Sequence, residues 1–401
     1  MHKMFFLLIS LYHLFTIVAG NSDNVWESII DDHLIPWTKL KISKQLIDDT
    51  YHYTGSNIIY QHINGELFII DKNNYCYCNI SVFAHDTTTF QRHLILCRAV
   101  ESILDKLVKS GNLPNFELVI SLDDIPMWYS RSNISGIFDI ETRQNSIFYP
   151  GFGAIRCWSK GGLSFPIYGY IYGWDIHTSE NYLNFSKNVK FDDKASKVTF
   201  RGSMNRGCSF EKNALIDFTY KSLEFNWTKT NCGRRLFQSK FGSKYPKYID
   251  FGYDYLSLHK QNDMFKYILS IEGYGGWSDR LSSLYFTNML VFDQEHPCEQ
   301  WFEPLVIPYK HYIPVHHDFR NLPNLVIWAE SHPNLVKQIL KNGNDFAQQY
   351  LRQQGILLYA HTLLKKYSKL LNYKITRRSG SHPSKVIYNK TFLDDRCRQY
   401  R

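Results

Sequence analysis

The chain has 401 residues, which suggests two domains, and 44% of them are hydrophobic, so a substantial core can form. The formal net charge is +9. A nucleic-acid-binding protein would concentrate such charge in runs or stripes, so we predict no nucleic-acid partner. The clearest basic cluster, from Lys365 through Arg378 and on to Arg401, is interpreted as a solvated face. A mildly basic protein of this kind would suit an anionic nucleotide or a membrane surface.

The N-terminus has the pattern of a secretory signal peptide. Lys3 precedes a largely apolar run from Met4 to Ala19, and small residues follow near the expected cleavage point at Gly20. Residues 1–20 are therefore predicted to be a signal peptide, with an uncleaved anchor as the alternative. Since this run is short for a spanning helix and no second candidate follows, no stable membrane span is expected.

Other features agree with the secretory pathway. The chain has five N-x-S/T sequons and eight cysteines, an even number that permits disulfides in an oxidising compartment. It has no KDEL-type retention signal, so we predict the endoplasmic reticulum lumen or secretion. Zinc is the competing interpretation of Cys76-x-Cys78, but no second element with ligand spacing supports it.

Four elements are predicted in the first part of the chain. Residues 58–60 and 66–71 predict a hairpin across Asn64-Gly65. Residues 87–110 predict a helix, because apolar residues recur near the 3.6-residue period and Gly111 stands at the C-cap. Residues 116–122 predict a buried strand.

Two carboxylates, Asp123 and Asp124, follow this strand directly. Functional groups gather at the carboxyl ends of strands in open α/β sheets, so these aspartates are candidates for chemistry. The alternative is that one of them caps the following turn, and the sequence does not separate the two interpretations. Residues 130–173 have no regular period and predict either a set of functional loops or irregular packing.

A second strand end carries phosphate-binding chemistry. After a predicted helix at 179–188 and a predicted linker at 187–197, a strand at 198–200 runs into Arg201, Gly202, Ser203 and Arg206. Guanidinium forks, a hydroxyl and glycine backbone are the groups that a diphosphate needs. The alternative is a surface turn with solvated arginines.

A third strand end is rich in glycine. An apolar run from Phe265 to Ile271 predicts a buried strand, and the glycines between 273 and 276 precede Ser278, Asp279 and Arg280. A short helix and a further strand at 289–292 are predicted next. A glycine turn between a strand and a helix suits an anion, and Arg280 supplies charge.

The C-terminal part predicts helices. Residues 335–341 and 345–373 predict two of them, with Gly355 as a possible kink. Before them, residues 311–317 contain three histidines. A metal is conceivable there, but ordinary polar contacts are the preferred interpretation.

Together these motifs resemble the Rumi-like, capsule-associated family of glycosyltransferases (glycosyltransferase family 90), most closely its animal protein O-glucosyltransferases. The resemblance covers roughly residues 60 to 380, with its motifs in the same order. They are residues 119–121 with Asp124 and Pro126, residues 200–203 with Arg206, residues 265–268 with Gly273 and 276–281, residues 311–315, and residues 367–373 with 376–378.

The resemblance implies a fold and a division into domains. The expected architecture is GT-B, with two Rossmann-like domains facing a cleft and a C-terminal helix packing back. The implied boundaries are residues 21–190 for an N-terminal acceptor and catalytic-base domain and 191–345 for a C-terminal UDP-sugar-binding domain. A C-terminal helix and basic tail would occupy residues 346–401. A monomer is expected.

The resemblance also implies an activity: inverting transfer of glucose, or xylose, from UDP-glucose or UDP-xylose to a serine hydroxyl of a secretory-pathway protein such as an EGF-like repeat. No cofactor or metal is implied. The alternatives are a capsule polysaccharide xylosyltransferase and a non-catalytic, lectin-like relative. Two departures concern the cysteine pattern, where Phe265 and Val291 stand near an expected disulfide pair, and the glycine turn, which is one residue longer.

By position, Asp124 corresponds to the family's catalytic base, with Asp123 as its rival. Inversion needs such a carboxylate to take the acceptor proton, and it needs charge or N–H donors on the leaving diphosphate. The implied donor-binding residues are Arg201, Ser203, Arg206, Gly276, Trp277, Ser278, Asp279 and Arg280.

Overall fold

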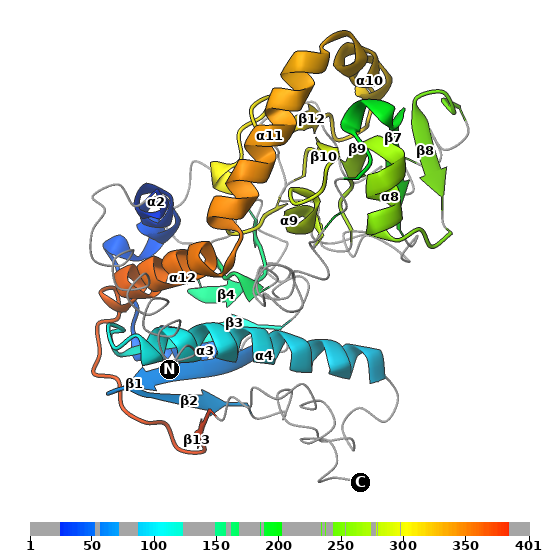
Figure 1. Ribbon diagram of the computed structural model, residues 1–401. Coiled ribbons are helices and arrows are strands. Elements are labelled where there is room, and N and C mark those ends of the chain that lie inside the picture. Colours follow the sequence, from blue (N-terminus) through cyan, green and yellow to red (C-terminus); the bar gives the residue numbers. More distant parts are fainter. Residues whose placement is uncertain are drawn as a thin grey trace, which may run out of the picture.

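The computed structural model describes residues 25–52, 57–71, 87–122, 149–157, 162–167, 185, 188–202, 234, 237, 244–252, 254–273, 278, 280–296 and 298–384. Within them the chain forms a mixed sheet, a parallel sheet and a small two-stranded sheet, with helices packed on the two larger sheets (Figure 1), which confirms the predicted α/β class. The predicted signal peptide, almost all of the helix predicted at 179–188 and most of the irregular region 130–173 lie outside the described residues.

The first sheet has the strand order β13-β2-β1-β3-β4-β6. Its strands are β1 (Asn57–Ile63), β2 (Glu66–Ile70), β3 (Phe116–Ser121), β4 (Gly151–Gly153), β6 (Leu163–Ser164) and β13 (His382–Pro383). The β1–β2 hairpin is as predicted. Asn64 and Gly65 both have positive φ, 50° and 88°, which is the type I′ geometry that two-residue hairpin turns favour.

Strand β3 is the centre of this sheet, because all of its residues are buried and it pairs with β1 on one side and β4 on the other. Helix α3 (Lys44–His52) packs against β1 and β3, and α4 (Thr87–Lys109) packs against β2. Helix α4 confirms the predicted helix, and Gly111 follows it with the positive φ of a C-cap, 79°. Helix α2 (Trp26–Thr38) precedes both.

The second sheet has the order β12-β10-β9-β7-β8, and all of its pairs are parallel. Its strands are β7 (Ala195–Arg201), β8 (Ile249–Gly252), β9 (Phe265–Ser270), β10 (Leu290–Gln294) and β12 (Ile313–Val315). Strand β7 begins earlier than predicted, so the end of the predicted linker 187–197 belongs to it. Helices α8 (Leu258–Met264) and α9 (Leu281–Leu284) flank β9.

Side chains on the two faces of β9 pack into two different hydrophobic clusters. Tyr267 and Leu269 join the cluster between this sheet and helices α10 (Leu322–Ser331) and α11 (Pro333–Tyr350). Ile268, which points the other way, joins a cluster that continues through Trp301 into the first sheet. The two sheets are therefore connected by one continuous hydrophobic cluster.

The helices near the C-terminus differ from the prediction. Helix α11 runs straight through residues 342–344, the chain breaks at Leu351 and Arg352, and α12 (Gln353–Ser368) follows. Gly343 is retained in α11 because a Cβ there would lie 2.8 Å from His311 O. Gly355 lies inside α12 rather than at a kink, and a Cβ there would lie 2.1 Å from Tyr350 O. Helix α10 was not predicted.

The segment after α12 returns across the first sheet and ends as β13 on the edge strand β2 (Figure 1). Arg378 pairs with Asp48 of α3 and with Glu117 of β3, whose side chain is 1% exposed. Gln61 donates a hydrogen bond to the same carboxylate, at 2.7 Å. The interpretation of residues 365–378 as a solvated face is therefore wrong for Arg378, which anchors this segment in a buried polar network.

Disulfides are present as expected. Cys97 of α4 and Cys298 are both disulfide-bonded, and no described cysteine is a free thiol. Cys298 lies in β11 (Cys298–Glu299), which pairs with β5 (Arg156–Cys157).

Candidate functional site

The order of the second sheet marks the place where a ligand is expected. Strands β7 and β8 lie on one side, and the chain then crosses to the other side of β7 to form β9, β10 and β12. The direction of sheet growth therefore reverses between β7 and β9. In open parallel sheets, ligands bind outside the carboxyl ends of the strands at such a switch point.

Two of the predicted arginines meet at this switch point. Arg201 ends β7, and Arg280 directly precedes α9. Arg280 Nη1 donates to Arg201 O at 2.6 Å, Arg280 Nη2 donates to Leu269 O at 3.3 Å, and the guanidinium lies 4.7 Å from the centroid of the Phe200 ring. The guanidinium is thus fixed between the carboxyl ends of β7 and β9.

Arg201 has different partners. Its guanidinium pairs with Asp250 Oδ2 of β8 at 2.6 Å and lies 3.4 Å from Asp254. These carboxylates compensate the charge of Arg201 and so reduce its attraction for a bound anion. Gly202, next to Arg201, leaves room that no other residue would leave, since a Cβ there would lie 2.9 Å from Phe200 Cζ.

Ser278 is the other predicted donor-binding residue that the structure describes. It is buried, and its carbonyl accepts hydrogen bonds from Leu281 N and from Gln300 Nε2, at 3.2 and 2.9 Å. In the described part of the chain, its hydroxyl has no hydrogen-bond partner. Buried polar atoms are ordinarily paired, so this hydroxyl has bonding capacity for a polar ligand.

The remaining predicted site residues lie outside the described residues. They are Asp123, Asp124, Ser203, Arg206, Gly276, Trp277 and Asp279. The described backbone still fixes where these segments start. The two aspartates follow the buried end of β3, and Ser203 follows Gly202 at the switch point.

A buried charge cluster beside the switch point was not predicted. His296 Nδ1 faces Cys298 O at 2.5 Å, and its Nε2 faces Glu303 and Asp293, at 3.4 and 3.8 Å. The carbonyl can only accept a hydrogen bond, so Nδ1 carries a proton, and the two acidic side chains beside Nε2 favour a proton there as well. The surroundings therefore favour the imidazolium form of His296, although its side chain is only 8% exposed.

This cluster is linked to Ser278. Glu303 Oε1 accepts from Gln300 N and Nε2, at 3.0 and 3.2 Å, and the same amide group donates to the Ser278 carbonyl. The cluster therefore supports the turn that precedes Arg280 and α9. The sequence shows only an acidic segment with one histidine, and no sequence pattern reports that the segment is buried.

Burial raises the pKa of Glu303 to about 7. Burial alone would lower the pKa of His296, but the carboxylates of Glu303 and Asp293 raise it to about 10. A group whose pKa is higher in the folded state than in the unfolded state stabilises the fold at pH values below its unfolded-state pKa. This stabilisation is lost as the pH rises from the unfolded-state pKa through the folded-state pKa. For Glu303 the window runs from 4.5 to about 7. For His296 it runs from 6.5 to about 10.

Stability is therefore expected to fall through both windows. We predict that the wild-type protein loses stability relative to Glu303→Gln as pH rises from 5 to 8, because glutamine does not titrate. Urea unfolding of both proteins at several pH values measures this difference. A difference that is constant with pH would contradict the prediction.

The segment after β10 also contacts two elements of the N-terminal half, β5 and α2. Glu299 of β11 pairs with Arg156 of β5 at 2.9 Å and with His33 of α2 at 3.5 Å. Burial acts to raise the pKa of Glu299, but His33 and Arg156 outweigh it and hold the pKa below its ordinary value. Glu299 is thus an ionised link from the segment after β10 to β5 and α2.

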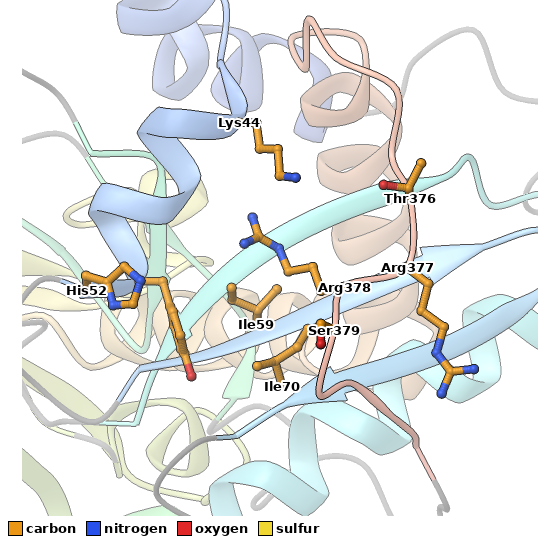
Figure 2. A pocket seen from close by; sticks show the side chains of 9 residues that line it. Lys44, His52, Ile59, Ile70, Thr376, Arg377, Arg378 and Ser379 are labelled. Carbon is orange, nitrogen blue, oxygen red and sulfur yellow. The ribbon is translucent and has the colours of Figure 1, made fainter.

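A separate pocket of about 310 Å³ lies on the first sheet (Figure 2). It is lined by Lys44, Tyr51, His52, Ile59, Ile70, Thr376, Arg377, Arg378 and Ser379. In Figure 2, Arg378 reaches toward α3 and Arg377 points away from it. Arg378 is engaged by Asp48 and Glu117, and Arg377 donates to Ser381. We therefore interpret these arginines as anchors of the C-terminal segment.

No helix among the described residues is long and apolar enough to span a bilayer.

Sequence comparison places the chain among known proteins. The sequence model of glycosyl transferase family 90 matches residues 24–391. "Protein O-glucosyltransferase 1" from Homo sapiens is 28% identical over 294 residues, which are 71% of this chain and 69% of that protein. "O-glucosyltransferase rumi" from Drosophila melanogaster is 23% identical over 365 residues, covering 87% and 77% of the two chains.

Proposed function

Because the chain belongs to glycosyl transferase family 90, we propose that it is an inverting protein O-glucosyltransferase that uses a UDP-sugar. The proposed reaction moves glucose, or xylose, from UDP to a serine hydroxyl of a secretory-pathway protein such as an EGF-like repeat. Relatives named as O-glucosyltransferases support the sugar and the bond. A fully parallel sheet joined to a mixed α/β sheet supports a GT-B architecture.

The observation that carries the proposal is the fixed guanidinium of Arg280 at the β7/β9 switch point. A UDP leaving group develops negative charge as the glycosidic bond breaks, and a preorganised cation stabilises that charge without having to reorganise. In this proposal Arg280 contacts the diphosphate together with Ser203 and Arg206. The segment containing Gly276, Trp277, Ser278 and Asp279 completes the donor site.

Asp124 takes the role of the catalytic base. Its carboxylate accepts the proton of the serine hydroxyl as the oxygen attacks the anomeric carbon from the face opposite UDP. The anomeric centre inverts, the bond to the UDP oxygen breaks, and UDP leaves with the electron pair. No metal is needed for these steps if arginines neutralise the diphosphate.

The proposed location is the endoplasmic reticulum lumen or the outside of the cell. Disulfide-bonded cysteines favour an oxidising compartment, and the predicted signal peptide would direct the chain there. The acceptor would then be a protein that passes through the same compartment.

The test is transfer by the purified protein to a folded EGF-like repeat. UDP-glucose and UDP-xylose are supplied in separate reactions, and intact-mass spectrometry reads the acceptor. We expect one sugar to be added to a serine. The mass gained by the acceptor identifies the donor, because glucose adds more mass than xylose. A reduced, unfolded repeat serves as the control acceptor. Turnover of neither donor by the folded protein would overturn the proposal and favour a binding role.

A further inference from the structure

Three metal-ligand side chains gather at the carboxyl edge of the second sheet, beside the switch point. Glu295 follows β10, and His316 and His317 follow β12, the parallel neighbour of β10. One ligand atom from each of the three lies within 4.8 Å of the others. Two hydrogen bonds hold this arrangement. Glu295 N donates to Val315 O at 2.8 Å, and the Gln294 side chain donates through Nε2 to His317 O at 2.7 Å.

The ring of His316 is oriented as a metal ligand is. Its Nδ1 lies 2.8 Å from Asp318 Oδ1, and a carboxylate can only accept, so Nδ1 carries the proton. The lone pair is then on Nε2, where Arg320 Nη2 donates to it at 2.6 Å. A carboxylate that fixes the far nitrogen of a histidine in this way is the usual support of a metal-binding imidazole.

Glu295 and His317 contact each other through the Oε2 atom of Glu295. This oxygen lies 3.7 Å from His317 Nδ1 and accepts from His317 N at 3.4 Å. The rings of His316 and His317 lie side by side, with centroids 3.9 Å apart.

We propose that Glu295, His316 and His317 form a binding site for a divalent transition-metal ion of the zinc class. Two imidazoles and one carboxylate are a known zinc set, with a water molecule in the fourth position. Magnesium and calcium are disfavoured, because they prefer oxygen ligands. Ligand atoms around tetrahedral zinc lie about 3.4 Å apart, so the three side chains must draw together by about an ångström.

Arg320 is the competitor for this site. Its side chain is 61% exposed, so it can leave the His316 ring at little cost, and a metal would replace the guanidinium at Nε2. Ordinary polar contacts, the preferred interpretation of these histidines from sequence, account for Asp318 and Arg320. They also account for the contact between Glu295 and His317, but they do not require ligand atoms of all three side chains to lie within 4.8 Å of one another.

Calorimetric titration with ZnCl₂ tests the proposal on the full chain, purified without a histidine tag and without any sugar donor. We expect one saturable site in the wild type and at least tenfold weaker binding in His316→Ala, His317→Ala and Glu295→Gln. Asp318→Asn is expected to weaken binding about 10- to 100-fold through ring orientation. His332→Ala, which changes a ring bonded within its own helix end, serves as the matched control and should bind as the wild type does.

Arg320→Ala provides the sharpest outcome, because removing a competing cation should tighten zinc binding. A purely structural polar network would not predict a gain. Titration with Co²⁺ supplies a second readout, the visible absorption of a tetrahedral complex, and circular dichroism checks that each variant is folded. Absence of a saturable site in the wild type would overturn the proposal. Zinc binding that survives in the folded His316→Ala/His317→Ala double variant would also overturn it.

Discussion

Asp124→Asn is expected to reduce sugar transfer by roughly 10²- to 10⁴-fold, the usual contribution of a general base. The amide keeps the size of the side chain but cannot accept the serine proton as the bond to the anomeric carbon forms. Affinity for UDP should stay close to that of the wild type, because the base contacts the acceptor rather than the diphosphate. Transfer rates and UDP calorimetry on the same preparation measure both quantities.

The matched control is Asp123→Asn. Neighbouring residues that continue a strand point to opposite sides, so only one of the two aspartates can face the substrate. We expect Asp123→Asn to keep most of the activity. If that variant is the inactive one and Asp124→Asn transfers normally, the role of base belongs to Asp123.

His296→Leu is expected to lower the free energy of unfolding by about 3 kcal/mol, the lower end of the range for breaking a buried ion pair. The imidazolium faces Glu303 and Asp293, whose side chains are 13% and 10% exposed. Leucine leaves both carboxylates poorly solvated and without their cation. Urea unfolding at pH 7 measures the change.

A second substitution separates charge from packing. The double variant His296→Leu/Glu303→Gln removes one of the two carboxylates that lost their cation, and it should recover part of the lost stability. Because Glu303 and Gln300 support the Ser278 turn, His296→Leu should also weaken UDP binding more than it changes the turnover rate. Equal stability of wild type and His296→Leu would show that the cluster does not hold the fold.

Much of the strand framework could be predicted from sequence. Strand β3 is a continuous apolar run because both faces are buried, and the hairpin at Asn64-Gly65 depends on local turn chemistry alone. The division of the last helices could not be predicted. Gly343 resembles a helix breaker in sequence, but its position in α11 is determined by contact with His311, a residue 32 positions earlier in the chain.

The candidate site also has features that could be predicted from sequence and features that could not. The glycines, Ser278 and Arg280 follow a recognisable strand, so their position at a strand end was predictable. The partners of Arg280 were not, because Arg201 O and Leu269 O are brought together only by the β7–β9 pairing. The cluster around His296 is invisible in sequence for a similar reason, since burial and the orientation of its ring depend on β11 pairing with β5.

The most direct test of a donor site at the β7/β9 switch point is calorimetric titration of UDP into wild type and Arg280→Met. We expect one site in the wild type and at least about tenfold weaker binding in the variant, since a hydrogen bond to a charged group contributes about 1.5–3 kcal/mol. Arg352→Met, which changes a guanidinium stacked on Phe286 away from this strand edge, should bind as the wild type does. Undiminished UDP affinity in a folded Arg280→Met protein would contradict the account.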